Sequence, residues 1–404
     1  MSATRYDLVI VGGGLVGGSL ACTLGRAGLR VALVEALAPA ARSQPSYDER
    51  VLALSWGSRR ILEAMGLWED LAPGAEPIRC VHVSDRGHFG FARLDSAEEG
   101  VAALGYVAPA RLIGQAIQAH LGGVDVFCPA RLIGFHLREE RVDIEVASEG
   151  ESRLLSAALL VAADGGDSAI RKRLGFDALE RGYGHDAIIS TVTPDQPQAG
   201  VAFERFTDTG PLALLPMTEG RYSVVWTARE SETGAILGLD DKAFIDHLQA
   251  RFGFRLGGLA RPGRRRAYPL KLMLTRKPVR QRLVLIGNAA HTLHPVAGQG
   301  LNLGLRDLAA LAQIVTDRVR AGADPGSPEA LRDYQCLRGG DQGRTALATD
   351  FLAHLFINPW LPLRLGRDLG LLTLDLMAGA RHHLARHFMG TTGHLPRMAR
   401  GLPL

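Results

Sequence analysis

The chain has 404 residues, of which 47% are hydrophobic and 22% are charged, a composition typical of globular proteins rather than disordered ones. Its 46 basic and 42 acidic residues leave a formal net charge of only +4, which argues against a nucleic-acid-binding protein. The four cysteines form no C-x-x-C pair and no metal-like spacing, and no apolar stretch reaches the ~18 residues of a transmembrane helix. We therefore expect two or three structural units, no bound metal and a reducing cytoplasmic location.

The N-terminal segment predicts a complete βαβ unit around a G-x-G-x-x-G pattern. Its elements are a buried strand over 6–11, a short helix over 20–27 and a second strand over 31–34. Gly12 permits the tight turn, Gly14 lets the backbone approach a pyrophosphate, and Gly17 lets the helix pack closely on the strand. Glu35, at the end of the second strand, accepts hydrogen bonds from an adenosine ribose and disfavours a 2′-phosphate. The pattern predicts a site for FAD or NAD rather than NADP.

The next segment is predicted to alternate between helix and strand. Residues 48–50 open an amphipathic helix that ends at Gly66, and the arginine at its start faces either solvent or a phosphate. Strand patterns begin at residue 78, a helical pattern surrounds 111–117, and a β-meander is predicted over 124–147.

A second motif follows the apolar strand predicted over 159–163. This strand ends in Asp164 and Gly165, with Ser168 and Arg171 shortly after. Ligands bind at the carboxyl ends of parallel strands, so this position favours a binding role for Asp164. The alternative is an Asx turn that precedes a helix.

Strand patterns dominate residues 176–275. Such a sheet can cover a large apolar pocket. Alternatively, its apolar side chains can pack together as a hydrophobic core without lining any pocket. The candidates for the pocket are Phe203, Phe206, Leu214, Met217 and Trp226.

A third motif returns the chain to the nucleotide-binding fold. The strand over 283–286 runs into Gly287 and Asn288, and the segment 298–300 precedes a helix. Backbone N–H groups at the start of that helix are oriented to hold the electron-rich O2 edge of a flavin ring.

The last part of the chain is predicted to be helical beyond a linker at 324–328. A packed helical cap is one interpretation of this tail. The other is a face that contacts membrane lipid or a partner protein. Its residues would be Phe356, Trp360, Leu361, Leu363 and Leu365, with Arg364 and Arg367 beside them.

The three motifs, in this order and at these spacings, resemble the class A flavoprotein monooxygenases, the FAD-dependent aromatic hydroxylases. Four further segments resemble the ubiquinone-biosynthesis hydroxylases that act on phenols of the 2-polyprenyl-6-methoxyphenol type. These segments are 47–50, 83–87, 203–206 and 210–216. In one departure from the class, Asn288 stands where its third motif usually has an aspartate.

The resemblance implies an α/β fold like that of p-hydroxybenzoate hydroxylase. A discontinuous Rossmann-like FAD-binding domain would comprise 1–75, 101–175 and 276–322. An inserted mixed-sheet substrate domain would comprise 76–100 and 176–275, followed by a C-terminal helical region over 323–404. The implied activity is hydroxylation of a polyprenylated phenol through a flavin C4a-hydroperoxide, with bound FAD and with NAD(P)H and O2 as co-substrates.

Site residues are carried over from the family by position. The predicted cofactor-binding residues are Gly12, Gly14, Gly17, Glu35, Arg50, Arg111, Leu132, Asp164, Gly287, Asn288, Gly298, Gln299, Gly300, Leu301 and Asn302. Pro295, Gly298 and His294 are the candidates beside the reacting part of the flavin, and His294 is alternatively structural. The predicted substrate contacts are Phe203, Leu214, Pro216 and Trp226.

Several alternatives stay open at this point. A sister enzyme acting at another ring carbon shares these motifs, as does a flavin reductase of an isoprenoid, and a non-catalytic scaffold would bind no flavin. The expected partner is a lipophilic small molecule. A homo-oligomer, or contact of the C-terminal helices with the inner membrane face or with other ubiquinone-biosynthesis proteins, is compatible with the sequence.

Overall fold

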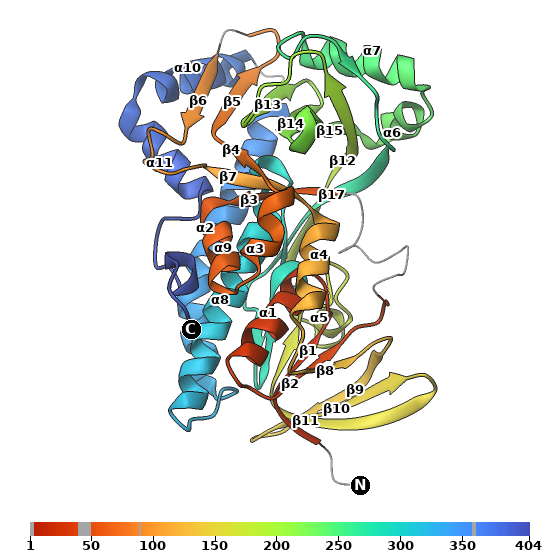
Figure 1. Cartoon of the computed structure of the whole chain (residues 1–404), viewed down its shortest axis with the longest axis vertical. Helices are drawn as coiled ribbons and strands as arrows, with labels where there is room; N and C mark the ends of the chain where they lie inside the picture. Colours follow the sequence, from red (N-terminus) through yellow and green to blue (C-terminus); the bar gives the residue numbers. More distant parts are fainter. Residues whose placement is uncertain (1–3, 39–49, 89, 358–360) are drawn as a thin grey trace.

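The structure is a computed structural model of the chain, shown in Figure 1. It describes residues 4–38, 50–88, 90–357 and 361–404, and their side chains except over 356–368. One face of the C-terminal region was proposed above to contact lipid or a partner protein. Its side chains, from Phe356 to Arg367, therefore lie outside the described residues. Within the described part of the chain, no helix has an apolar stretch long enough to cross a bilayer.

The first sheet carries the nucleotide-binding unit. Its strand order is β18-β19-β11-β1-β2-β8, and the five strands from β19 to β8 run parallel. The bounds are β1 (Thr4–Val11), β2 (Val31–Val34), β8 (Val124–Phe127), β11 (Glu151–Ala162), β18 (Val279–Arg280) and β19 (Leu283–Leu285). An antiparallel hairpin of β9 (Arg131–Leu137) and β10 (Val142–Ser148) extends from β11.

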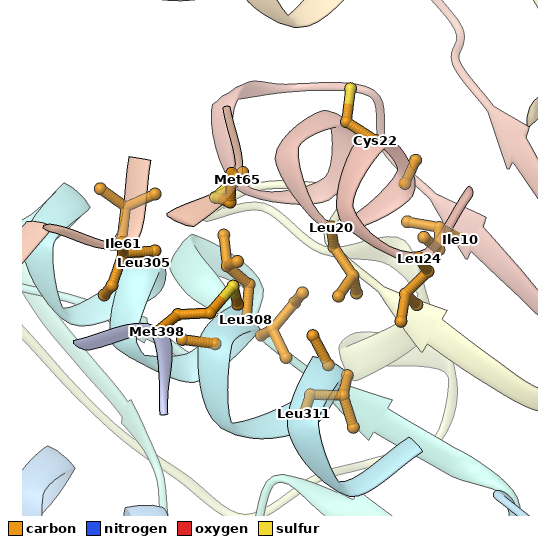
Figure 2. Close-up of a cluster of buried hydrophobic side chains, with 14 of the residues drawn as sticks. Ile10, Leu20, Cys22, Leu24, Ile61, Met65, Leu305, Leu308, Leu311 and Met398 are labelled. Carbon is orange, nitrogen blue, oxygen red and sulfur yellow. The ribbon is translucent and has the colours of Figure 1, made fainter. Parts of the chain in front are cut away.

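Both faces of this sheet are covered, which explains the uninterrupted apolar run of β1. Ile10 on one face belongs to the core under the helices α1 (Leu15–Arg26) and α8 (Gln299–Arg320), as Figure 2 shows. Val9 on the other face packs in a second core with β9 and β10. The remaining helices of this half are α2 (Trp56–Ala64), α3 (Trp68–Leu71), α4 (Ala110–Ala119) and α5 (Ala169–Arg173).

The second sheet occupies the upper part of Figure 1 and has the order β20-β17-β12-β15-β14-β13-β5-β6. Its strands are β5 (Cys80–Asp85), β6 (Phe91–Asp95), β12 (Ala178–Pro194), β13 (Val201–Thr207), β14 (Gly210–Pro216), β15 (Tyr222–Arg229), β16 (Leu259–Ala260), β17 (Arg266–Thr275) and β20 (His291–Thr292). The helices α6 (Glu230–Leu237) and α7 (Asp241–Phe252) pack with the core of one face, and the other face looks toward the first sheet.

A small antiparallel sheet corrects one sequence prediction. Residues Val51–Ser55 form strand β3 rather than the first turns of a helix, and helix α2 begins only at Trp56. β3 pairs with β7 (Gly105–Pro109), which also pairs with β4 (Glu76–Ile78). The apolar residues of 51–55 suit either element, and a pairing partner some fifty residues away decides between them.

The C-terminal region is helical, as predicted. It consists of α9 (Pro328–Ile357), α10 (Leu361–Leu376) and α11 (Ala378–Phe388). Helix α9 packs on α8, and α9 and α10 cover strands β13 and β6 of the second sheet. Short 3₁₀ turns complete the structure at 72–74, 218–220, 287–289, 296–298 and 398–400.

Candidate active site

A cavity of about 1370 Å³ lies between the carboxyl ends of β1, β2 and β11 and the inner face of the second sheet. Pockets for one drug-sized molecule occupy roughly 300–1,000 Å³, so this volume accommodates a cofactor together with a substrate. One end is polar, with Glu35, Arg50, Arg131, Asp164 and Asp167 on its wall. The other end is largely apolar and is formed by the second sheet and by α9, α10 and α11.

At the polar end the glycine loop approaches its neighbours too closely for any side chain. Gly12 has φ +103°, and a Cβ on it would stand 2.3 Å from the carbonyl oxygen of Ala163. A Cβ on Gly17 would stand 2.0 Å from the carbonyl oxygen of Gly12. Gly14 lines the cavity and precedes α1 without a side-chain cap, so the first N–H groups of α1 are available to an anion.

Glu35 lies at the end of β2 on the wall of the cavity. Its two carboxylate oxygens accept hydrogen bonds from the backbone N–H of Gly13 at 2.5 Å and of Leu37 at 2.7 Å. These bonds hold the carboxylate beside the glycine loop, and its remaining lone pairs can accept ribose hydroxyls.

Asp164 follows β11 on the same wall. One carboxylate oxygen accepts a hydrogen bond from the N–H of Ile170 at 3.4 Å, whereas the other is buried without a partner in the described part of the chain. A buried unpaired carboxylate oxygen costs free energy unless a donor is supplied. The hydroxyl groups of FAD are such donors, so the residues present fit this cofactor.

Arg171 joins the second and third motifs. Its guanidinium is buried and donates to the carbonyl oxygens of Gly166 at 2.8 Å and Ala289 at 2.9 Å. Arg171 is part of the second sequence motif, which by itself predicts no role for it. Its role in the structure is to hold together two loops of the cavity wall.

The loop before α8 is fixed to strand β3. Asn302 donates to the carbonyl oxygens of Ala53 at 2.9 Å and Gly298 at 2.7 Å, and it accepts from the N–H of Ser55 at 2.8 Å. Gly298 has φ +61°, which favours glycine. The residues of this loop on the cavity wall are Pro295, Val296, Ala297, Gly298, Gln299, Gly300, Leu301 and Asn302.

Other predicted cofactor residues divide between the cavity wall and its surroundings. Leu132, Asn288 and Arg50 lie on the wall, where the guanidinium of Arg50 stands over the ring of Tyr268 at 5.2 Å. Gly287 is buried behind the cavity wall and has φ +57°. Arg111 is exposed at the start of α4 and does not line the cavity, so the structure does not place it with the other predicted FAD contacts.

Three of the four predicted substrate residues lie outside the cavity lining. Leu214 and Trp226 point to the opposite face of the sheet and pack in the core with Phe244 of α7. Pro216, at the end of β14, is buried and also absent from the wall. Phe203 borders the cavity, although its ring packs mainly toward α7.

The strand residues that do face the cavity are one position out of phase with these three. They are Ala213 and Leu215 of β14 and Val225 and Thr227 of β15. Because both faces of these strands are apolar, the sequence pattern could not show which set faces the ligand.

His294 is placed in a structural role rather than beside the cavity. It is fully buried, its Nδ1 accepts from the N–H of Val296 at 3.2 Å, and its ring meets the edge of Tyr183. Burial lowers the pKa of His294 to about 4, helped by the charges of His185 and His354. A neutral, enclosed imidazole off the cavity wall does not reach a substrate, which corrects its candidate catalytic role.

This environment makes stability dependent on pH. The pKa of His294 is below its unfolded value of 6.5, so its contribution to stability is present above pH 6.5 and is lost as the pH falls toward 4. Relative to His294→Asn, the wild type should lose about 1–2 kcal/mol of unfolding free energy between pH 7 and pH 5. Urea unfolding at both pH values measures this, and equal losses in the two proteins would contradict it.

The fold and the site define an FAD-dependent monooxygenase of class A. The model of the FAD binding domain family matches residues 5–335. Among solved structures, p-nitrophenol 4-monooxygenase PnpA from Pseudomonas putida superimposes with a TM-score of 0.79 at 19% identity, over 97% of this chain and 99% of that one. The anhydrotetracycline hydroxylase OxyS from Streptomyces rimosus gives a TM-score of 0.74 at 22% identity, over 97% and 77%.

Proteins of similar sequence show to which family within this class of monooxygenases the chain belongs. The chain is 38% identical to ubiquinone hydroxylase UbiL of Rhodospirillum rubrum, over 98% of its own length and 93% of the relative's. It is 30% identical to 3-demethoxyubiquinol 3-hydroxylase of Escherichia coli, over 96% and 100%. The chain therefore belongs to the FAD-dependent hydroxylases of ubiquinone biosynthesis. The predicted family, fold class and FAD cofactor are confirmed.

Proposed function

We propose that this enzyme hydroxylates the aromatic ring of a polyprenylated phenol of the 2-polyprenyl-6-methoxyphenol type. The observation that carries the proposal is the continuity of the cavity. Its wall passes from Gly298 and Pro295, the loop expected beside the flavin ring, to the apolar inner face of the second sheet. A phenol head beside the flavin can thus be joined to a prenyl tail along the sheet.

The apolar end of the cavity supports a substrate with a hydrocarbon tail. The sheet contributes Ile189, Leu215 and Val225, and the C-terminal helices complete the wall. The helix residues on this wall are Phe351, Leu352, Leu355, Gly370, Leu371, Leu374, Leu384, Ala385, Phe388 and Met389. Burying apolar surface stabilises a bound tail by about 25 cal/mol per Å² of surface, or about 0.8 kcal/mol for each CH₂ group.

The protein and the cofactor divide the chemistry between them. FAD, when bound, carries electrons from NAD(P)H to O2 and activates oxygen for transfer to the ring. The glycine loop, Glu35 and Asp164 are the residues that would hold FAD at the polar end. The C-terminal helices cover the apolar end and keep water from the reacting groups.

Isotope labelling tests this function directly. We expect purified, FAD-loaded enzyme to consume O2 faster when a 2-polyprenyl-6-methoxyphenol is added with NAD(P)H. Under ¹⁸O₂, mass spectrometry should find one ¹⁸O atom in the product, and protein stripped of FAD should form none. A reduced prenyl chain without ¹⁸O would instead identify a flavin reductase. Fragmentation of the labelled product shows which ring carbon is hydroxylated, and a carbon other than that of the methoxyphenol pathway identifies a sister enzyme.

A further inference from the structure

One acidic residue, Glu204, stands on the part of the cavity wall formed by the second sheet. On strand β13, Phe203 and Arg205 face α7: the ring of Phe203 lies 5.5 Å from that of Phe252, and Arg205 donates to the carbonyl oxygen of Arg251 at 3.1 Å. Side chains alternate along a strand, so Glu204 projects to the opposite face, where it lines the cavity.

The described residues around Glu204 offer its carboxylate no hydrogen-bond donor or positive charge. Its register partners are Val83 of β5 and Ala213 of β14, which both line the cavity and carry no polar side-chain atom. Within the described residues, the structure shows neither a hydrogen bond nor an ion pair to its carboxylate. Burial raises the pKa of Glu204 to about 7.

The charged groups of the neighbouring elements are directed elsewhere. Asp85 of β5 lies two pairs further along, opposite Phe206, and does not line the cavity. On α9, Asp350 accepts a hydrogen bond from Tyr183 at 2.8 Å and one from Arg181 at 3.2 Å, and the ring of His354 lies beside the same arginine. The side chains that α9 and α10 pack toward β13 are leucines.

The carboxyl group of Glu204 is partly buried and no described residue supplies it with a partner, so this environment is less favourable for its charged form than water is. A molecule in the cavity can supply the missing partner. The sheet wall is otherwise apolar apart from the hydroxyl groups of Thr227 and Thr292 and the phenol of Tyr268. A substrate that combines an apolar body with one hydroxyl group therefore has a specific contact on this wall in Glu204.

We propose that Glu204 binds the phenolic hydroxyl group of the substrate and accepts its proton during hydroxylation, an inference that rests on the function proposed above. The O–H bond breaks, its proton passes to the carboxylate, and the electron pair left on oxygen activates the ring carbons ortho and para to it. One of these carbons takes one atom of O2 and loses its proton to solvent, and Glu204 returns its proton to the ring oxygen. NAD(P)H supplies two electrons through the flavin, and the second oxygen atom leaves as water.

The test compares Glu204→Gln with Glu219→Gln, which alters an exposed carboxylate in the turn after β14. Glu204→Gln should retain FAD and its reduction by NAD(P)H, while kcat/KM for the phenol falls about 100-fold, the effect of losing a general base. Wild-type kcat/KM should rise with pH through about 7, because the base must be ionised, and this rise should be absent in Glu204→Gln. Glu204→Asp should restore part of the rate and the rise, and Glu219→Gln should match the wild type.

The outcomes separate this inference from the proposed function. A wild type that does not hydroxylate the phenol overturns the proposed function and this inference with it. If the wild type is active, Glu204→Gln with an unchanged rate and pH profile overturns the role of Glu204 alone. A lower rate that keeps the pH dependence of the wild type overturns it too, because it shows an effect on cavity shape rather than on proton transfer.

Discussion

Replacing Gly17 with alanine is expected to weaken FAD binding by about 10- to 100-fold, equivalent to about 1–3 kcal/mol of overpacking. The new Cβ would stand 2.0 Å from the carbonyl oxygen of Gly12 and 2.9 Å from the Cβ of Ala163. Because the nearest of these atoms is backbone, α1 or the glycine loop has to move. Either movement displaces the N–H groups that face the pyrophosphate.

Titration of the apoprotein with FAD, followed by quenching of flavin fluorescence, measures this change. Gly122→Ala is the matched control, since Gly122 is exposed and a Cβ there meets nothing within 4 Å. Thermal unfolding of the apoproteins separates a local effect on the site from a loss of fold. Wild-type affinity in Gly17→Ala would show that the close approach of helix and loop is not needed for the cofactor.

Replacing Asp307 with alanine should lower the free energy of unfolding by about 3–5 kcal/mol, because it leaves buried polar groups without their partner. Asp307 of α8 is fully buried and accepts hydrogen bonds from His291 at 2.5 Å, Arg338 at 2.8 Å and Gln342 at 3.0 Å. Burial alone would raise the pKa of Asp307, but the opposite charges of His291 and Arg338 lower it overall. The carboxylate thus links the third motif, α8 and α9.

The control is Asp317→Ala on the same helix. Asp317 forms an ion pair with Arg397 at 2.5 Å, but its side chain is 49% exposed, so its loss should cost at most about 1 kcal/mol. Urea unfolding of both variants at pH 7 gives the comparison. Equal stability losses at the two positions would contradict a special role for the buried network.

The sequence predicted the structure correctly where a feature depends only on residues that are close together in the chain. The glycine spacing from Gly12 to Gly17 followed a strand and opened a helix, as the structure confirms. The segment before α8 was predicted from the same kind of reasoning, and its residues lie on the cavity wall. In these places a tight turn or a helix start restricts which residues can stand there.

Prediction failed where the answer depended on which face of an element meets its neighbours. Leu214 was expected at the ligand, and Leu215 takes that position. Glu204 belonged to a segment that indicated the family, but its direction was unknown until the phase of β13 was fixed by its packing on α7. In the same way, β3 was taken for helix because its partner β7 is distant in the chain.

The sequence by itself determined the family, the glycine loop after β1 and the loop before α8, because turns and helix starts depend on residues that are close together in the chain. The tertiary structure alone decided which side chains face the cavity, that His294 is buried away from it, and that Glu204 lies on its wall with no partner among the described residues. A shift of one residue in a strand reverses every side chain, and only the packing of distant elements excludes that shift.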